Sequence, residues 1–162
     1  RQGNIDLYAH PRVMKALERT FSYIFETENK YPGAPSVNEH YIDGNPFAIR
    51  DLKVVPIDGL HNTLQVYGYR FDNFAYLTDM KTVSDTEIKK LHNLEVLVIN
   101  ALREEPHVSH FNLEEALDFI SKVNPKRAYL THISHHMGFH DEVQQKLPEN
   151  VYLAYDNLQI TI

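Results

Sequence analysis

The sequence Ala-Tyr-Leu-Thr-Asp at residues 75–79 returns at residues 128–132 as Ala-Tyr-Leu-Thr-His, with only its last residue changed. Each copy is typical of a short buried strand that ends in threonine, and each then continues into a side chain able to bind a metal ion. Open α/β folds place their sites at the sheet edge where neighbouring strands end. The repeat therefore predicts that Asp79 and His132 are delivered to one edge of a sheet.

The residues around this repeat predict an α/β fold. Residues 95–100 form an apolar run, which is typical of a strand buried on both faces. A helix with an apolar stripe is expected from Pro11 as far as Phe25, and another is expected after Asn112. An Asp58-Gly59 turn is expected to close a strand over residues 52–57. Further strands are predicted over residues 5–9, 63–71, 74–78, 127–131, 151–154 and 158–162, and further helices over residues 84–91 and 140–147.

The composition excludes several classes of function. The 162 residues contain no cysteine, which rules out disulfides, thiolate metal sites and cysteine nucleophiles and fits a reducing, cytoplasmic compartment. With 16 Lys and Arg against 22 Asp and Glu, the net charge of −6 counts against a general nucleic-acid or anionic-membrane surface. No apolar run approaches the ~20 residues that span a bilayer, so no membrane partner is expected. Ten histidines remain, and histidine is the residue of acid–base catalysis and metal ligation.

The histidines gather in two segments. Three of them lie within residues 132–136, with His140 close behind, and packing explains them poorly because imidazoles are poor core fillers. Ligating histidines stand on rigid strand ends, whereas the alternative is a solvated histidine-rich loop. His107 and His110 lie between a buried strand and the helix that Asn112 caps, where the positive field keeps an imidazole neutral. A neutral imidazole at the mouth of a site can exchange a proton near pH 7.

Two further residues are ambiguous when each is taken alone. His61 follows the predicted turn and precedes a strand, so by itself it is typical of an exposed loop histidine. Asp79 is as typical of a turn or cap aspartate as of a functional one. Their place in a longer ordered pattern is what favours a functional interpretation.

That pattern is a set of segments in a characteristic order and spacing. Its members are the run His-Asn-Thr-Leu-Gln-Val-Tyr-Gly-Tyr-Arg-Phe at 61–71, Tyr-Leu-Thr-Asp at 76–79, the loop with His107 and His110, Leu-Thr-His-Ile-Ser-His at 130–135, and Ala-Tyr-Asp at 154–156. Together they resemble the metallo-β-lactamase fold, in the branch that contains the cyclic phosphoribosyl phosphodiesterase of phosphonate breakdown, a neighbour of ribonuclease Z. The resemblance implies an α/β fold of the αββα sandwich type.

The resemblance also implies roles for individual residues. His61 matches the third histidine of a first metal site, Asp79 matches the aspartate that bridges two metals, and His132 matches a histidine of the second site. His110 matches a catalytic histidine near the scissile phosphate, as proton donor or phosphate contact. His107 and His135 match positions that support the ligands or the substrate, while no role is implied for His136 and His140.

The sequence departs from this family in one respect. The motif His-x-His-x-Asp-His, which supplies the other four ligands, does not occur in the 162 residues. In relatives it lies upstream of the segment that resembles residues 1–10. We therefore expect residues 1–162 to form a single, N-terminally truncated domain that holds a partial αββα sandwich. We also expect the intact parent to be the active enzyme and this chain alone to be inactive.

These observations lead to one functional prediction with two alternatives. The prediction is a metal-dependent phosphodiesterase that acts on a small cyclic or nucleotide-like phosphodiester with two divalent ions, zinc or manganese. The alternatives are an RNA hydrolase like ribonuclease Z, against which the acidic balance counts, and a metal-free remnant or interaction module. Missing strands would leave an apolar edge, which makes a homodimer a possible partner arrangement.

Overall fold

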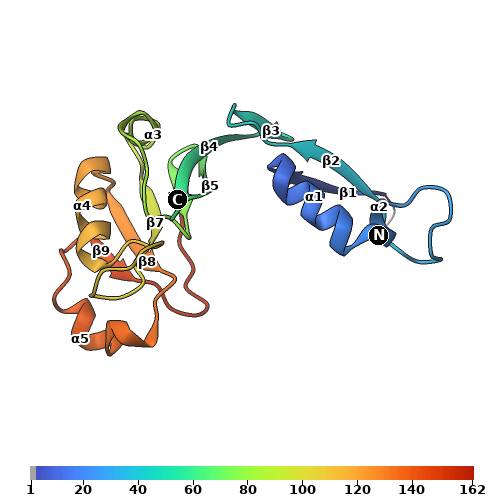
Figure 1. Cartoon of the computed structure of the whole chain (residues 1–162). Coiled ribbons are helices and arrows are strands. Elements are labelled where there is room, and N and C mark those ends of the chain that lie inside the picture. The colour runs from blue at the N-terminus through green and yellow to red at the C-terminus, as the bar shows by residue number, and fades with distance from the viewer. Residues whose placement is uncertain (1–2) are drawn as a thin grey trace. The chain divides into compact units, whose positions relative to one another are not determined.

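Strand β7 (Val96–Asn100) is buried at every residue and belongs to a seven-stranded sheet in the computed structural model, which describes residues 3–162 (Figure 1). The strands follow one another across this sheet in chain order: β3 (Phe47–Ile49), β4 (Leu52–His61), β5 (Leu64–Phe71), β6 (Phe74–Leu77), β7, β8 (Arg127–Thr131) and β9 (Val151–Leu153). Strands β3 to β6 pair antiparallel, and β6 to β9 pair parallel. Because Leu77 and Leu130 both pair with Ile99, the two copies of the repeated sequence end at one edge, as predicted.

One face of the sheet packs against three helices. These helices are α3 (Asp85–Lys89), α4 (Leu113–Val123) and α5 (His140–Gln144), and a short 3₁₀ helix spans His135–Met137. Helix α3 contacts β4 and α4, α4 contacts β7, and α5 contacts β9. Their apolar side chains join those of the strands in one buried cluster, which includes Leu77, Leu97, Ile99, Leu130, Phe119 and Ile120. Among residues 3–162, no helix is long and apolar enough to cross a membrane.

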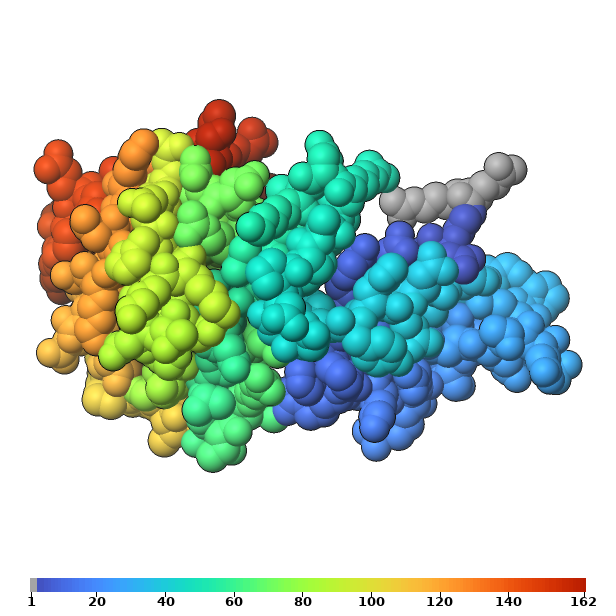
Figure 2. Space-filling view, turned by 90° about the horizontal axis from the view of Figure 1, so that it is seen from above, coloured from blue at the N-terminus to red at the C-terminus, as the bar shows by residue number. Residues whose placement is uncertain are grey.

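The chain divides into two units, residues 1–45 and residues 46–162. In the first unit, β1 (Ile5–Ala9) pairs in parallel with β2 (Val37–Tyr41). The helix predicted through Phe25 is two helices, α1 (Pro11–Thr20) and α2 (Ser22–Phe25). The space-filling view shows the surface of the second unit, in colours from cyan and green through yellow to orange and red (Figure 2). The expectation of a single domain over residues 1–162 stays a prediction.

Two local predictions are wrong. The turn expected at Asp58-Gly59 does not form, because β4 continues to His61 and its hairpin turn lies at Asn62, whose φ is 56°. Gly59 is needed for close packing instead, since a Cβ there would lie 2.9 Å from the sulfur of Met80. The strand expected over residues 158–162 is absent, and strands β2 and β3 were not predicted.

The start of α4 forms as predicted and is joined to the loop after β6 by an ion pair. Asn112 accepts a hydrogen bond from the Glu115 backbone, and the Glu115 carboxylate accepts one from the Asn112 backbone, which completes a capping box. Lys81 Nζ lies 2.6 Å and 2.7 Å from the two oxygens of that carboxylate. Burial by itself raises the pKa of Glu115, but the hydrogen bonds from Lys81 and Asn112 and the charge of Lys81 outweigh burial and lower it.

We predict that Glu115→Gln destabilises the protein at neutral pH and not in acid. A carboxyl whose pKa is lowered in the folded state contributes stability above its unfolded pKa, and this contribution is lost as the pH falls through the folded pKa. That window lies below the ordinary value of 4.5. The expected loss at pH 7 is about 0.5 kcal/mol, because solvent screens a partly exposed pair. Urea denaturation at pH 7 and at pH 3 measures it.

Glu114→Gln is the matched control, because Glu114 is the exposed neighbour in the same helical turn. It should leave the free energy of unfolding unchanged at both pH values. An equal loss for Glu115→Gln at pH 7 and pH 3 would show that its charge contributes nothing.

Candidate metal centre

The two ends of the repeated sequence have the same unusual backbone. Asp79 follows Thr78 beyond the end of β6, and His132 follows β8 directly. Both residues have a φ of 56°, in the left-handed region that non-glycine residues adopt at a cost. Such conformations persist where the surrounding structure imposes them, and they concentrate at functional sites. The two copies of the repeat thus share one strand-to-loop geometry. The first copy ends in a carboxylate and the second ends in an imidazole.

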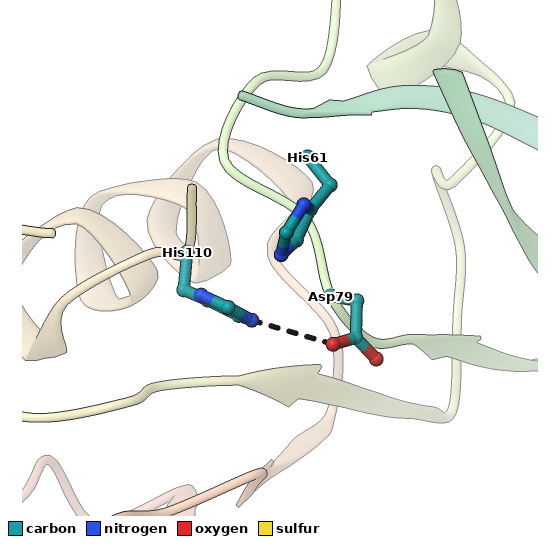
Figure 3. Close-up of side chains that lie close together, drawn as sticks. All are labelled: His61, Asp79 and His110. Atoms are coloured by element: carbon teal, nitrogen blue, oxygen red, sulfur yellow. Dashed lines mark hydrogen bonds and ion pairs between the residues drawn. The ribbon is translucent and has the colours of Figure 1, made fainter. Parts of the chain in front are cut away.

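Three side chains from separate segments of the chain come together at this edge. His61 is the last residue of β4, Asp79 follows β6, and His110 lies in the loop between β7 and α4. One potential ligand atom from each lies within 4.8 Å of the other two, and Figure 3 shows the side chains pointing toward one another. This is the group within residues 3–162 that could hold a metal ion.

Asp79 is the centre of this group. His110 Nε2 lies 3.3 Å from Asp79 Oδ1, and His132 Nε2 lies 3.4 Å from the same oxygen. The rings of His110 and His132 stack with centroids 4.8 Å apart, and the ring of His61 meets that of His110 edge-on at 4.6 Å. Three imidazoles therefore surround one carboxylate.

The far side of the His110 ring is held by its own loop. His110 Nδ1 lies 3.0 Å from Ser109 Oγ and 3.1 Å from His107 Nδ1. Because the Asp79 carboxylate accepts a hydrogen bond, we assign the proton of neutral His110 to Nε2, which leaves Nδ1 as an acceptor for the Ser109 hydroxyl. His107 thus contacts His110 on the side of the ring opposite Asp79, and its supporting role stays a prediction. Ser109 was not predicted, although its place between two histidines is a signal for such a contact.

The electrostatics of the group follow from burial and from mutual contact. Burial of the Asp79 carboxylate raises its pKa, but the hydrogen bond from His110, the charge of His132 and the hydrogen bond from Thr78 lower it more. Burial lowers the pKa of His110, and the neighbouring histidines lower it further, against the raising effect of Asp79. The site therefore combines an ionised carboxylate with a neutral imidazole at neutral pH.

The remaining histidines of the second segment lie elsewhere. His135 and His136 pack ring against ring with centroids 3.9 Å apart, and His140 contacts Asp141 and the ring of Tyr155. None of these histidines belongs to the group that could hold a metal ion among residues 3–162. The supporting role expected for His135, and the metal roles expected for His61, Asp79 and His132, stay predictions.

The donor set fits a transition metal ion. Neutral imidazole nitrogens with one carboxylate suit zinc, manganese or iron, whereas magnesium and calcium favour oxygen ligands. The chain contains no cysteine, so no thiolate competes for the ion. Histidine and carboxylate side chains at the carboxyl ends of the strands of a helix-covered mixed sheet are the kind of donors that α/β proteins use to bind divalent metals.

Comparison with known proteins identifies the family. Residues 1–133 match the family described as the beta-lactamase superfamily domain, so the chain belongs to that superfamily. A diphosphatase from the PhnP family is 31% identical with a TM-score of 0.88, over 99% of this chain and 59% of that one. Human tRNase Z, short form, is 18% identical with a TM-score of 0.67, over 99% of this chain and 68% of that one. The predicted metallo-β-lactamase fold is confirmed, and the similarity to a PhnP-family protein agrees with the predicted branch, whereas human tRNase Z is similar in fold.

A curated relative carries a different name. The octanoyltransferase of Porphyromonas gingivalis (strain ATCC BAA-308 / W83) is 34% identical over 158 residues, which cover 96% of this chain. The chain spans 32% of the length of that protein and 59% of the diphosphatase. Both relatives are therefore longer than the chain described here.

We predict that the 162-residue chain binds zinc weakly, or as a single ion, and that Asp79→Asn lowers the affinity at least tenfold. A catalytic zinc site has three protein ligands as a rule, and one carboxylate shared by two sites leaves each ion short of that number. Isothermal titration with zinc and with manganese measures the stoichiometry and the affinity.

His92→Ala is the control, because His92 is exposed and lies outside the group. His135→Ala tests the alternative that the ion is bound by residues 132–136. A tenfold loss in His135→Ala with none in Asp79→Asn would move the metal to that segment.

Proposed function

We propose that the protein to which this chain belongs is a metal-dependent hydrolase of a small cyclic or nucleotide-like phosphodiester. The observation that carries the proposal is the convergence of His61, Asp79 and His110 within 4.8 Å, with His132 on the same carboxylate oxygen. The similarity to a protein described as a PhnP-family diphosphatase supports a phosphate compound as substrate. A cytoplasmic location also stays part of the proposal, on the ground that the chain has no cysteine.

The site residues divide the chemistry among them. His61, Asp79 and His132 would hold divalent ions, with Asp79 shared. Such ions polarise a phosphoryl oxygen and lower the pKa of water, so that hydroxide is available near pH 7. Asp79 is ionised at this pH and supplies the negative charge that retains cations.

His110 would act on the substrate. Its Nε2–H is aimed at the centre of the group, where it can donate to a phosphate oxygen or give a proton to the leaving oxygen. Ser109 Oγ and His107 Nδ1 contact the opposite ring nitrogen and fix the direction in which Nε2 points. Only 9% of His110 is exposed, so its ring has little freedom to turn away.

Two other activities have less support. Human tRNase Z shares the fold, but the net charge of −6 offers no general surface for a polyanion.

For acyl transfer, as the name of the octanoyltransferase would imply, a hydroxyl nucleophile beside His110 would have to be Ser109. Ser109 is 7% exposed and faces the loop interior with His107, so it is badly placed to reach an acyl substrate. A metal-free interaction module remains the alternative from another class.

We predict that zinc- or manganese-loaded full-length protein hydrolyses bis(p-nitrophenyl) phosphate, and that two substitutions separate the roles. Asp79→Asn should abolish turnover and lower metal content, because it removes the shared charge. His110→Ala should retain the metals and lose turnover by about 10²–10⁴-fold, as expected for a lost acid or phosphate contact. Elemental analysis and kcat measured on the same preparations test both.

His92→Ala should match the unmodified protein in metal content and in turnover. Loss of metal in His110→Ala would make His110 a ligand. Absence of both metal and turnover in the unmodified protein would favour the interaction module, and turnover on p-nitrophenyl octanoate alone would favour acyl transfer.

A further inference from the structure

Asn100 is a polar side chain buried without solvent contact at the end of β7. It is 0% exposed and ends a strand that is buried at every residue. Its Oδ1 accepts a hydrogen bond of 2.9 Å from the backbone N–H of Met80, and its Nδ2 donates one of 3.0 Å to the backbone oxygen of Met80. Burial of an amide is costly unless both ends are paired, and here one backbone residue pairs them both.

Met80 is the residue after Asp79, so these two bonds act directly on the strained part of the site. The φ of 56° at Asp79 is disfavoured for an L-residue, and the neighbouring structure has to impose it. Met80 is itself 0% exposed, and its sulfur packs closely on Gly59. Met80 directly follows Asp79. Its backbone is therefore held by the packing of the Met80 side chain near Gly59 and by the two hydrogen bonds to the Asn100 side chain.

The same short segment is joined to the loops that carry the other two members of the group. The oxygen of Met80 also accepts a hydrogen bond of 2.9 Å from the N–H of Phe111, the residue after His110. On the other side, Lys81 N–H donates to the oxygen of Leu60, the residue before His61, at 2.8 Å. Each of the three side chains in the group is thus one residue away from a hydrogen bond to the segment that Asn100 holds.

We propose that Asn100 is a positioning residue for the metal site: its side-chain amide holds Met80 so that Asp79 and His110 meet at hydrogen-bond distance. The inference rests on the proposed function, because it assigns Asn100 to the site proposed there. Asparagine suits the role since one planar group donates and accepts at once, as a neighbouring strand would. Leucine has a similar volume and can do neither.

The competing explanation is that Asn100 only stabilises the fold. Val98→Ala is the matched control, because Val98 lies two residues earlier in the same strand, is 7% exposed, and on the alternating pleat faces the same side of the sheet as Asn100. Its truncation removes packing without removing a hydrogen bond to Met80. Thermal unfolding compares the stabilities of the two variants. The other measurements are made well below both unfolding temperatures, so that folded proteins are compared.

The experiment compares Asn100→Leu with Val98→Ala by two measurements. Zinc titration of the 162-residue chain should show an affinity at least tenfold lower for Asn100→Leu than for Val98→Ala. Hydrogen exchange followed by NMR should show selectively faster exchange at the Phe111 amide in Asn100→Leu. That amide is informative because it contacts Met80 and not Asn100, so it reports the position of the segment. Asn100→Ala serves for both measurements if the leucine variant does not fold.

Each outcome is decisive. Equal zinc affinity and equal Phe111 exchange in the two variants would overturn the positioning role and leave the proposed function intact. If the unmodified chain and full-length protein bind no zinc, the proposed function fails. Exchange at the Phe111 amide then decides by itself whether Asn100 holds the segment of Met80 against the loop of His110. Faster exchange throughout β7, with no selective effect at Phe111, would leave Asn100 as a residue of the fold only.

Discussion

The common level at which β6, β7 and β8 end is the constraint on which the site depends. Leu77, Ile99 and Leu130 share one row of the parallel register, and the chain continues past each of them toward the same edge. A shift of one residue in either pairing would turn side chains to the opposite face of the sheet. The buried residues of β7 oppose such a shift, because every one of them would exchange its packing environment.

Beyond the strand ends, backbone hydrogen bonds carry this alignment into the loops. Ala101 N–H donates to the oxygen of Thr131, and Leu102 N–H donates to that of Phe111. Ser134 N–H in turn donates to the oxygen of Leu102. The residues that follow β7 therefore join the loop after His132 to the loop of His110. A site assembled from loops is held in this way by the ordered strand between them.

The imidazole groups of the site contact one another and one carboxylate. The Nδ1 atoms of His107 and His110 face each other at 3.1 Å, so one of them has to carry a proton for the contact to be favourable. Three histidine rings also surround the Asp79 carboxylate, and two of them approach the same oxygen. A divalent cation at this site would be bound by the Asp79 carboxylate and by imidazole nitrogens, whereas His135, His136 and His140 lie outside the group that could hold a metal ion among residues 3–162.

The class of fold, the pairing of the two repeated segments with one buried strand, and most of the residues that meet at the strand ends were predictable from the sequence. Strand periodicity and the helix cap at Asn112 are local properties, so pattern and propensity were sufficient for them. The pattern at Gly59 was misleading, because a glycine required by close approach of Met80 resembles a glycine in a turn. The contacts of Ser109 and Asn100 near the site, and the place of His135 outside the group that could hold a metal ion among residues 3–162, are properties of the folded chain. The Asn100 side chain accepts one hydrogen bond from Met80 and donates one to it, and these residues lie 20 positions apart in the sequence. Such contacts form only once the strands have taken their register.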